Sequence, residues 1–167
     1  MPADIQRVIQ NKELILSTIQ SKGPSLPIHI ARAINLNTLF ASAFLSELYG
    51  EKRIKMSNLK VGSSSLYYLE GQETQLENFI NYLNQREQQA FTLLKKEKIL
   101  QEEILEPAIR VAIKEIKDFA LPIRVNHDGT EKIFWRYFQL SEEEAKTIIT
   151  QILEPKKERK SLSLERH

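Results

Sequence analysis

The chain has 167 residues, of which 41% are hydrophobic and 28% charged, and its formal net charge is +2. This length accommodates one ordinary domain or two small ones of about 70–80 residues each, with enough apolar residues for a core. The absence of cysteine excludes a disulfide scaffold, a cysteine-ligated zinc site and a thiol nucleophile, and the three histidines are scattered.

The sequence contains no signal-type apolar segment and no run near the roughly 18 apolar residues that a membrane span needs. We therefore expect a cytoplasmic protein that does not enter a membrane. We also expect no cofactor and no bound metal.

Charge is distributed unevenly along the chain. Residues 1–71 carry +3, from eight Lys or Arg against five Asp or Glu. Residues 72–155 carry −4, from eleven Lys or Arg against fifteen Asp or Glu. Residues 156–167 carry +3, from five Lys or Arg against two Asp or Glu. Such blocks indicate a chain of modules, although differences of this size also arise by chance. The net charge is far below that of a protein that coats nucleic acid by electrostatics alone.

The first 71 residues predict three helices followed by a hairpin. Apolar residues at steps of three and four predict a helix over 3–21, which Gly23-Pro24 ends. Pro27 opens a short second helix, and Asn37 or Thr38 caps a third that Gly50 closes. The pattern then changes to that of a strand over 52–57, a loop over 58–64 and a returning strand over 65–70.

Residues 72–100 contain no proline and predict one long linker helix that leads into a second module over 101–155. In that module, Pro107 opens a helix, and a hairpin follows whose turn contains Asp128-Gly129, a dipeptide typical of tight turns. Ser141 begins a capping box that opens a last helix. The tail, 156–167, is basic and is expected to be disordered.

The order of elements resembles that of tandem winged-helix proteins, of the compact kind common in archaeal transcription and replication. Residues 22–72 follow the family's helix-turn-helix-wing order, and residues 104–138 follow it more loosely, because the second helix is short or missing there. The resemblance implies a mainly α fold with small β-hairpin wings (α+β), in which a long helix joins two winged-helix modules. Winged helices mostly bind duplex DNA, and a minority bind proteins.

DNA binding needs polar groups on the recognition helix and cations near phosphates. We expect Leu39, Leu45, Leu48 and Phe44 or Ala41 to face the core. The predicted contacts in the first module are the hydroxyls and cations Thr38, Ser42, Ser46, Lys52, Arg53, Lys55 and Lys60. In the second module Arg110, Lys114 and Lys117 form a stripe at i, i+4 and i+7. A solvated hairpin with edge lysines is the alternative reading of the first set.

No nucleophile, base and orienting group can be assembled from this sequence, so we expect a non-enzyme. The first hypothesis is a DNA-binding factor of transcription or replication that is associated with the nucleoid and pairs as a homodimer to span two half-sites. The alternative is a protein-interaction adaptor within a larger complex, which the acidic second module and the recognition helix without Lys or Arg favour. RNA or ribosome association has only the basic tail in its favour.

Overall fold

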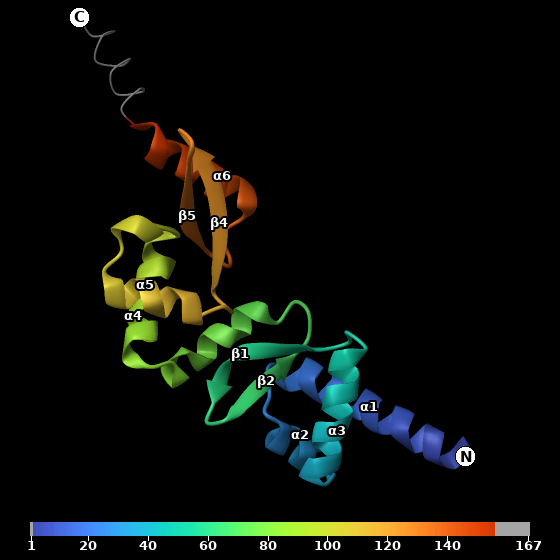
Figure 1. Ribbon diagram of the computed structural model, residues 1–167. Coiled ribbons are helices and arrows are strands. Elements are labelled where there is room, and N and C mark those ends of the chain that lie inside the picture. The colour runs from blue at the N-terminus through green and yellow to red at the C-terminus, as the bar shows by residue number, and fades with distance from the viewer. Residues whose placement is uncertain (1, 156–167) are drawn as a thin grey trace, which may run out of the picture. The chain divides into compact units, whose positions relative to one another are not determined.

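A computed structural model describes residues 2–155 and shows an α+β chain with two compact units, Met1–Asn84 (unit 1) and Gln85–His167 (unit 2) (Figure 1). The boundary between the units falls inside the segment that was expected to be one linker helix. The predicted tail, 156–167, lies outside the described residues. Among the described helices, none is both long and apolar enough to cross a membrane.

Unit 1 has the expected order of helices and strands. Its elements are α1 (Pro2–Lys22), α2 (Pro27–Ala33), α3 (Thr38–Gly50), β1 (Lys55–Val61), β2 (Ser64–Tyr68) and the 3₁₀ helix η1 (Glu73–Tyr82). Gly23, at φ +85°, follows the end of α1, and Pro27 is the first residue of α2. The side-chain oxygen of Asn37 accepts a hydrogen bond of 2.7 Å from the Leu39 N–H, which caps α3.

The hairpin of unit 1 has a shorter loop than the sequence suggested. Strand β1 continues to Val61, because Ser57 and Leu59 point inward and are buried. The register of the β1–β2 pairing is irregular between Met56 and Lys60, in the part of β1 where these two side chains point inward. The Ser57 hydroxyl bridges it, since it donates to the Leu59 carbonyl at 2.7 Å and accepts from the Leu66 N–H at 2.9 Å.

A short segment between α1 and α2 extends this hairpin. Ser25 forms an isolated antiparallel bridge with Tyr67 of β2, with backbone hydrogen bonds of 2.9 Å in both directions. The extended segment before α2 therefore lies beside the second strand of the hairpin.

The core of unit 1 lies where α1, α2 and α3 meet the hairpin. It is built from aliphatic residues of these elements: Ile15, Ile19, Ile30, Leu45, Leu48 and Ile54. Ala41 is also buried and Phe44 packs against the cluster, as expected. The prediction for Leu39 is wrong, because its side chain is 75% exposed.

The prediction of one long linker helix over residues 72–100 is also wrong. Residues 73–82 form η1, the chain becomes extended at Leu83, and helix α4 (Gln85–Glu97) starts two residues later. Asn81 and Asn84 flank this break, and asparagine side chains compete with the helix for backbone hydrogen bonds. The apolar stripe read from the sequence is therefore divided between two cores, with Leu76 in unit 1 and Ala90 and Leu94 in unit 2.

Unit 2 begins with α4 and continues through short elements to a second hairpin. The elements are β3 (Ile99–Gln101), the 3₁₀ helix η2 (Glu102–Ile104), α5 (Pro107–Glu115), β4 (Ala120–His127), β5 (Thr130–Tyr137) and α6 (Glu142–Leu153). Asp128 and Gly129 are the two residues of the β4–β5 turn, both at positive φ, so the predicted tight hairpin is confirmed. The Ser141 hydroxyl accepts from the Glu144 N–H at 3.1 Å, which confirms the predicted cap of α6.

The sheet of unit 2 has the order β3-β5-β4, and both pairings are antiparallel. The strand that precedes the middle helices thus pairs with the last strand of the hairpin. The Ser25–Tyr67 bridge places the corresponding segment of unit 1 in the same position.

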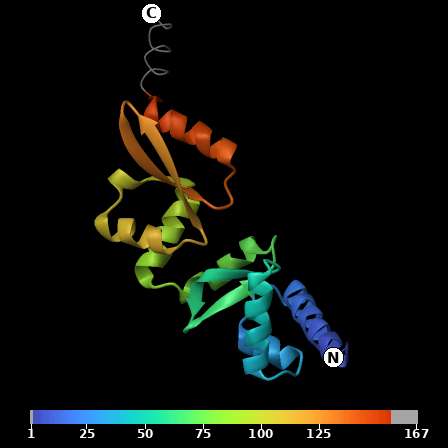
Figure 2. The same ribbon diagram turned by 45° about the vertical axis from the view of Figure 1, so that its right-hand side comes forward.

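Aromatic side chains fill the core of unit 2 on both faces of β5. Phe134 is fully buried in a cluster with Ile149 of α6, and both views show α6 beside the β4–β5 hairpin (Figure 2). On the other side, Tyr137 and Phe119 meet the ring of Phe91 from α4 edge to face. Both ring-bearing faces of the strand are covered within unit 2, so no second subunit is needed to cover them.

Candidate nucleic-acid interface

Helix α3 presents the three predicted hydroxyls but no cation. Thr38 and Ser46 are exposed and Ser42 is half-buried. The helix contains neither Lys nor Arg, and its one charged residue, Glu47, is exposed. Helix α3 thus offers polar groups for base edges and no positive charge for phosphates.

Of the predicted hairpin cations, three hold partners within unit 1. The Arg53 guanidinium lies 2.8 Å from the Glu13 carboxylate. Lys55 Nζ lies 2.9 Å from Glu73 Oε2. Lys60 Nζ donates a hydrogen bond of 2.8 Å to the Ser65 hydroxyl. These contacts tie the hairpin to its own unit.

Lys52 follows α3 at a positive φ of 61° and is exposed. Within the described part of the chain, no carboxylate lies within ion-pair distance of its ammonium group. It is therefore the predicted cation of unit 1 that is best placed to meet a phosphate.

Burial disfavours the charged form of Glu73, but the hydrogen bond from Lys55 and the backbone N–H of Gly71, at 2.7 Å, outweigh it and lower the pKa of Glu73. Glu73 therefore stays ionised at neutral pH, and its ion pair with Lys55 is retained.

A second ion-pair group lies at the C-terminal end of α3, where Lys12 of α1 contacts two carboxylates. Its Nζ is 2.9 Å from Glu51 Oε2 and 3.0 Å from Glu47 Oε2. The hydrogen bond with Glu51, then that with Glu47, raises the pKa of Lys12, and the Lys12 ammonium lowers the pKa of Glu51. This group links α1 to the C-terminal end of α3, and both of its carboxylates already have an ammonium partner.

In unit 2 the three residues of the predicted basic stripe on α5 make different contacts. The Arg110 guanidinium donates to the carbonyl oxygens of Glu103, at 3.2 Å, and Leu105, at 3.0 Å. It thus satisfies backbone groups at the end of η2. Lys114 Nζ lies 3.8 Å from a Glu102 oxygen. Lys117 is exposed.

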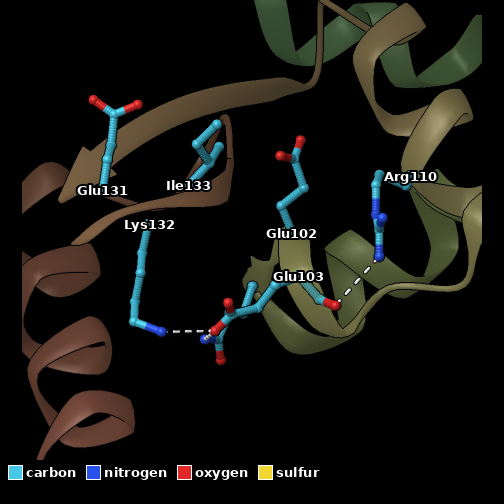
Figure 3. A pocket seen from close by; sticks show the side chains of 7 residues that line it. Glu102, Glu103, Arg110, Glu131, Lys132 and Ile133 are labelled. Carbon is cyan, nitrogen blue, oxygen red and sulfur yellow. Dashed lines mark hydrogen bonds and ion pairs between the residues drawn. The ribbon is translucent and has the colours of Figure 1, made fainter. Parts of the chain in front are cut away.

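A hollow of about 220 Å³ lies beside Arg110 and is lined by charged side chains of η2, α5 and β5 (Figure 3). Lys132 reaches Glu103 at 2.8 Å, and the pKa of Glu103 is lowered mainly by the hydrogen bond from this ammonium group. The other two carboxylates also have partners, because Glu102 contacts Lys114 and the Trp135 indole N–H, at 3.2 Å, and Glu131 contacts Arg124 at 3.0 Å. Each carboxylate that lines the hollow therefore has a cation beside it.

Metal binding has no support from the described residues. In residues 2–155, no group of three or more Asp, Glu or His side chains is arranged to hold a metal ion.

The sequence reasoning missed an apolar surface on α3. Leu39 is 75% exposed and Phe40 is 57% exposed. The buried positions Ala41, Leu45 and Leu48 follow steps of four and three, and a residue two positions before Ala41 lies about 200° from it around a helix. The same periodicity that identified the core could therefore have excluded Leu39 from it.

Comparison with protein-family models, with curated proteins and with solved structures finds no match to this chain.

Proposed function

We propose that this chain is a non-enzymatic protein-interaction adaptor with a winged-helix arrangement in each unit, and that α3 binds the partner in unit 1. The observation that carries the proposal is the exposed pair Leu39 and Phe40 on a helix without a cation. Exposed apolar side chains that form a contiguous patch mark contacts with other proteins.

The winged-helix arrangement is supported by the order of elements. In unit 1 the order is helix, bridging segment, two helices and hairpin, and in unit 2 it is helix, strand, 3₁₀ helix, helix and hairpin. In both units the extended segment before the middle helices pairs with the last hairpin strand. In such modules α3 and α5 occupy the place of the recognition helix.

The charges around α3 favour a protein over a duplex as its ligand. Phosphate neutralisation supplies most of the affinity of non-specific DNA binding. Helix α3 contains no cation, and Glu47 and Glu51 flank its C-terminal end. Both carboxylates are paired with Lys12, so α3 itself offers a phosphate backbone no free cation, whereas an apolar protein segment would cover Leu39 and Phe40.

Binding of duplex DNA, in a factor of transcription or replication, is the second candidate. Exposed Lys52 and Lys60 near or on the hairpin of unit 1, and exposed Lys117 in unit 2, support it. Surface ion pairs contribute only about 0–1 kcal/mol, so Arg53 and Lys55 are also able to exchange their partners for phosphates.

The adaptor proposal is tested by affinity capture from native lysate of the protein's own cells. The wild type is compared with the double variant Leu39→Ser/Phe40→Ser and with the control Ile152→Ser, which removes a partly exposed apolar residue of α6. We expect one partner protein, retained by the wild type and the control and lost by the double variant. Circular dichroism confirms that all three are folded. Equal capture by all three proteins, or no captured protein, contradicts the proposal.

DNA binding is tested by fluorescence anisotropy with a labelled duplex of about 30 base pairs, at about 50 mM and 150 mM salt. The adaptor proposal predicts no binding at either salt concentration. Binding that weakens with salt and is lost in the variant Lys52→Ala/Arg53→Ala/Lys55→Ala/Lys60→Ala establishes the second candidate instead.

A further inference from the structure

Strand β4 forms an outer edge of the sheet in unit 2, since the strand order is β3-β5-β4. The β4–β5 loop has two residues, so His127 and Thr130 form a hydrogen-bonded pair, and such pairs alternate along the ladder with positions that face away from β5. The positions of β4 that face away are Ala120, Pro122, Arg124 and Asn126.

Two observations agree with this alternation. The Ala120 N–H donates to the Ile116 carbonyl at 3.0 Å and not to β5. Pro122, which has no N–H, occupies a position that needs none for the β4–β5 ladder. The backbone groups of Arg124 and Asn126 therefore point outward from the sheet.

These outward groups are open. In the part of the chain that the structure describes, no backbone hydrogen bond joins the N–H of Arg124 or Asn126 to a group outside the β4–β5 ladder. The buried sheet residues in the cluster of α6 are Ile99 of β3 and Phe134 of β5, so α6 is centred on these two strands and not on β4. A row of open N–H and C=O groups along a strand is complementary to another extended strand.

The other sheet edges of the described residues are short, irregular or paired. Strand β3 has only three residues. Strand β1 has an irregular register, and its Lys55 forms an ion pair with Glu73 of η1. Strand β2 is bridged by Ser25. Proteins protect their sheet edges in these ways, whereas β4 is a regular strand of eight residues with a continuous edge.

We propose that two copies of this chain pair through β4. The two strands run antiparallel about a two-fold axis, with Val125 opposite Val125 of the partner subunit and Arg124 opposite Asn126 of the partner subunit. The pairing joins the two sheets of unit 2 into one continuous sheet. This inference goes beyond the proposed function, because it concerns unit 2 and does not depend on any ligand of α3.

Hydrogen bonding selects this register. With Arg124 opposite Asn126 of the partner subunit, each of the two residues donates its outward N–H and accepts at its outward carbonyl, and the two-fold axis repeats the exchange. A shift that places Arg124 opposite its own copy sets two like charges side by side. The same shift places Asn126 opposite Pro122, which has no N–H to donate.

The charges on the exposed face of β4 are complementary in this register. Arg124 lies diagonally across from Asp128 of the partner subunit, and the Asp128 side chain is 89% exposed. Within its own chain, Arg124 contacts Glu131 at 3.0 Å, and both side chains are exposed. The dimer thus places each arginine between two carboxylates, one from each chain. This complementarity favours a second copy as the occupant of the edge.

The inner face of β4 gains cover from the same pairing. Ile123 and Val125 are only partly buried against the cluster of α6. In the dimer, the two Val125 side chains meet in a non-hydrogen-bonded pair, the type in which side chains are closest, and Ile123 lies opposite His127 of the partner subunit. One short strand per chain buries less area than a standard interface, so we expect a dissociation constant in the micromolar range.

Sedimentation velocity of the full chain, from about 5 to 500 μM, tests the proposal. We expect a monomer–dimer equilibrium. Asn126→Pro removes an N–H that faces away from β5, as Pro122 does in the wild type, and should raise the dissociation constant at least about tenfold because the two-fold axis doubles the loss. The control Asn126→Ala keeps the N–H and should change it by less than about threefold. Circular dichroism and Trp135 fluorescence confirm that both variants are folded.

Charge reversal tests the register. Arg124→Glu and Asp128→Lys each place like charges across the interface and should weaken the dimer by roughly threefold to tenfold. The double variant Arg124→Glu/Asp128→Lys restores opposite charges and should recover the wild-type affinity. Lysine at a positive φ already occurs in this chain at Lys52 and Lys98. A double variant as weak as either single variant contradicts the proposed register.

Amide hydrogen exchange locates the interface. The N–H groups of Arg124 and Asn126 should exchange more slowly in the dimer than in the diluted monomer. The N–H of Val125, which belongs to the β4–β5 ladder, should be protected in both. A dimer in which the first two amides exchange as in the monomer overturns the inference.

The remaining outcomes also decide the inference and separate it from the adaptor proposal. A chain that is monomeric at the highest concentration, or a dimer that Asn126→Pro leaves intact, overturns the inference without affecting the proposed role of α3. A dimer that is lost in Leu39→Ser/Phe40→Ser forms through α3 instead and also overturns it. If the chain is monomeric and a captured protein protects the Arg124 and Asn126 amides, the edge binds a strand of that protein, and the pairing of two copies is refuted.

Discussion

Replacement of Phe119 by alanine tests the core of unit 2 most directly. Its ring is fully buried, and its centroid lies 5.0 Å from that of Phe91 and 5.5 Å from that of Phe138. Truncation of a buried phenylalanine costs about 3–5 kcal/mol, and each edge-to-face pair contributes roughly 0.5–1.5 kcal/mol of that. A unit of about 80 residues has a total stability of only about 4–12 kcal/mol, so Phe119→Ala should remove a large part of it.

Urea unfolding followed by tryptophan fluorescence measures this loss. The chain contains one tryptophan, Trp135, which is buried on β5, so the signal reports on unit 2. The matched control is Phe40→Ala, which removes an exposed ring from unit 1 and should change this transition by less than about 0.5 kcal/mol. If Phe119→Ala costs less than about 1 kcal/mol, or no more than the control, the described packing of unit 2 is wrong.

Three further predictions concern single polar groups. Ser141→Ala removes the cap of α6 and should destabilise unit 2 by about 1 kcal/mol in the same fluorescence assay, whereas Ser141→Asp should retain most of the stability. Ser57→Ala leaves the buried Leu66 N–H without its acceptor and should cost about 1–3 kcal/mol, measured by circular dichroism in urea; a loss comparable to that of the exposed Ser63→Ala would contradict this role. The hydrogen bond from Lys12 keeps the pKa of Glu51 low, so this pair stabilises the fold above the unfolded pKa of about 4.3 and loses its effect as pH falls through the lower folded pKa. Glu51→Gln should therefore make stability fall less steeply below about pH 4, and an unchanged acid limb would show that the pair does not stabilise the fold.

The sequence determined those elements whose signals are local. Pro27 began a helix and Asn37 capped one, because each acts on backbone groups within one turn. The Asp128-Gly129 turn followed from the positive φ that a two-residue hairpin loop requires, and Ser141 fixed the start of α6. The α+β class and the order of helices and hairpins followed from these signals.

Tertiary structure decided the features that depend on what packs against a segment. A continuous apolar stripe predicted one helix over 72–100, but the chain breaks at Leu83 because its two halves belong to different cores. Arg110 was predicted to contact DNA, but its guanidinium donates hydrogen bonds to the carbonyl oxygens at the end of η2 instead. In each case local preference was compatible with several environments, and only the neighbours supplied by the fold selected one of them.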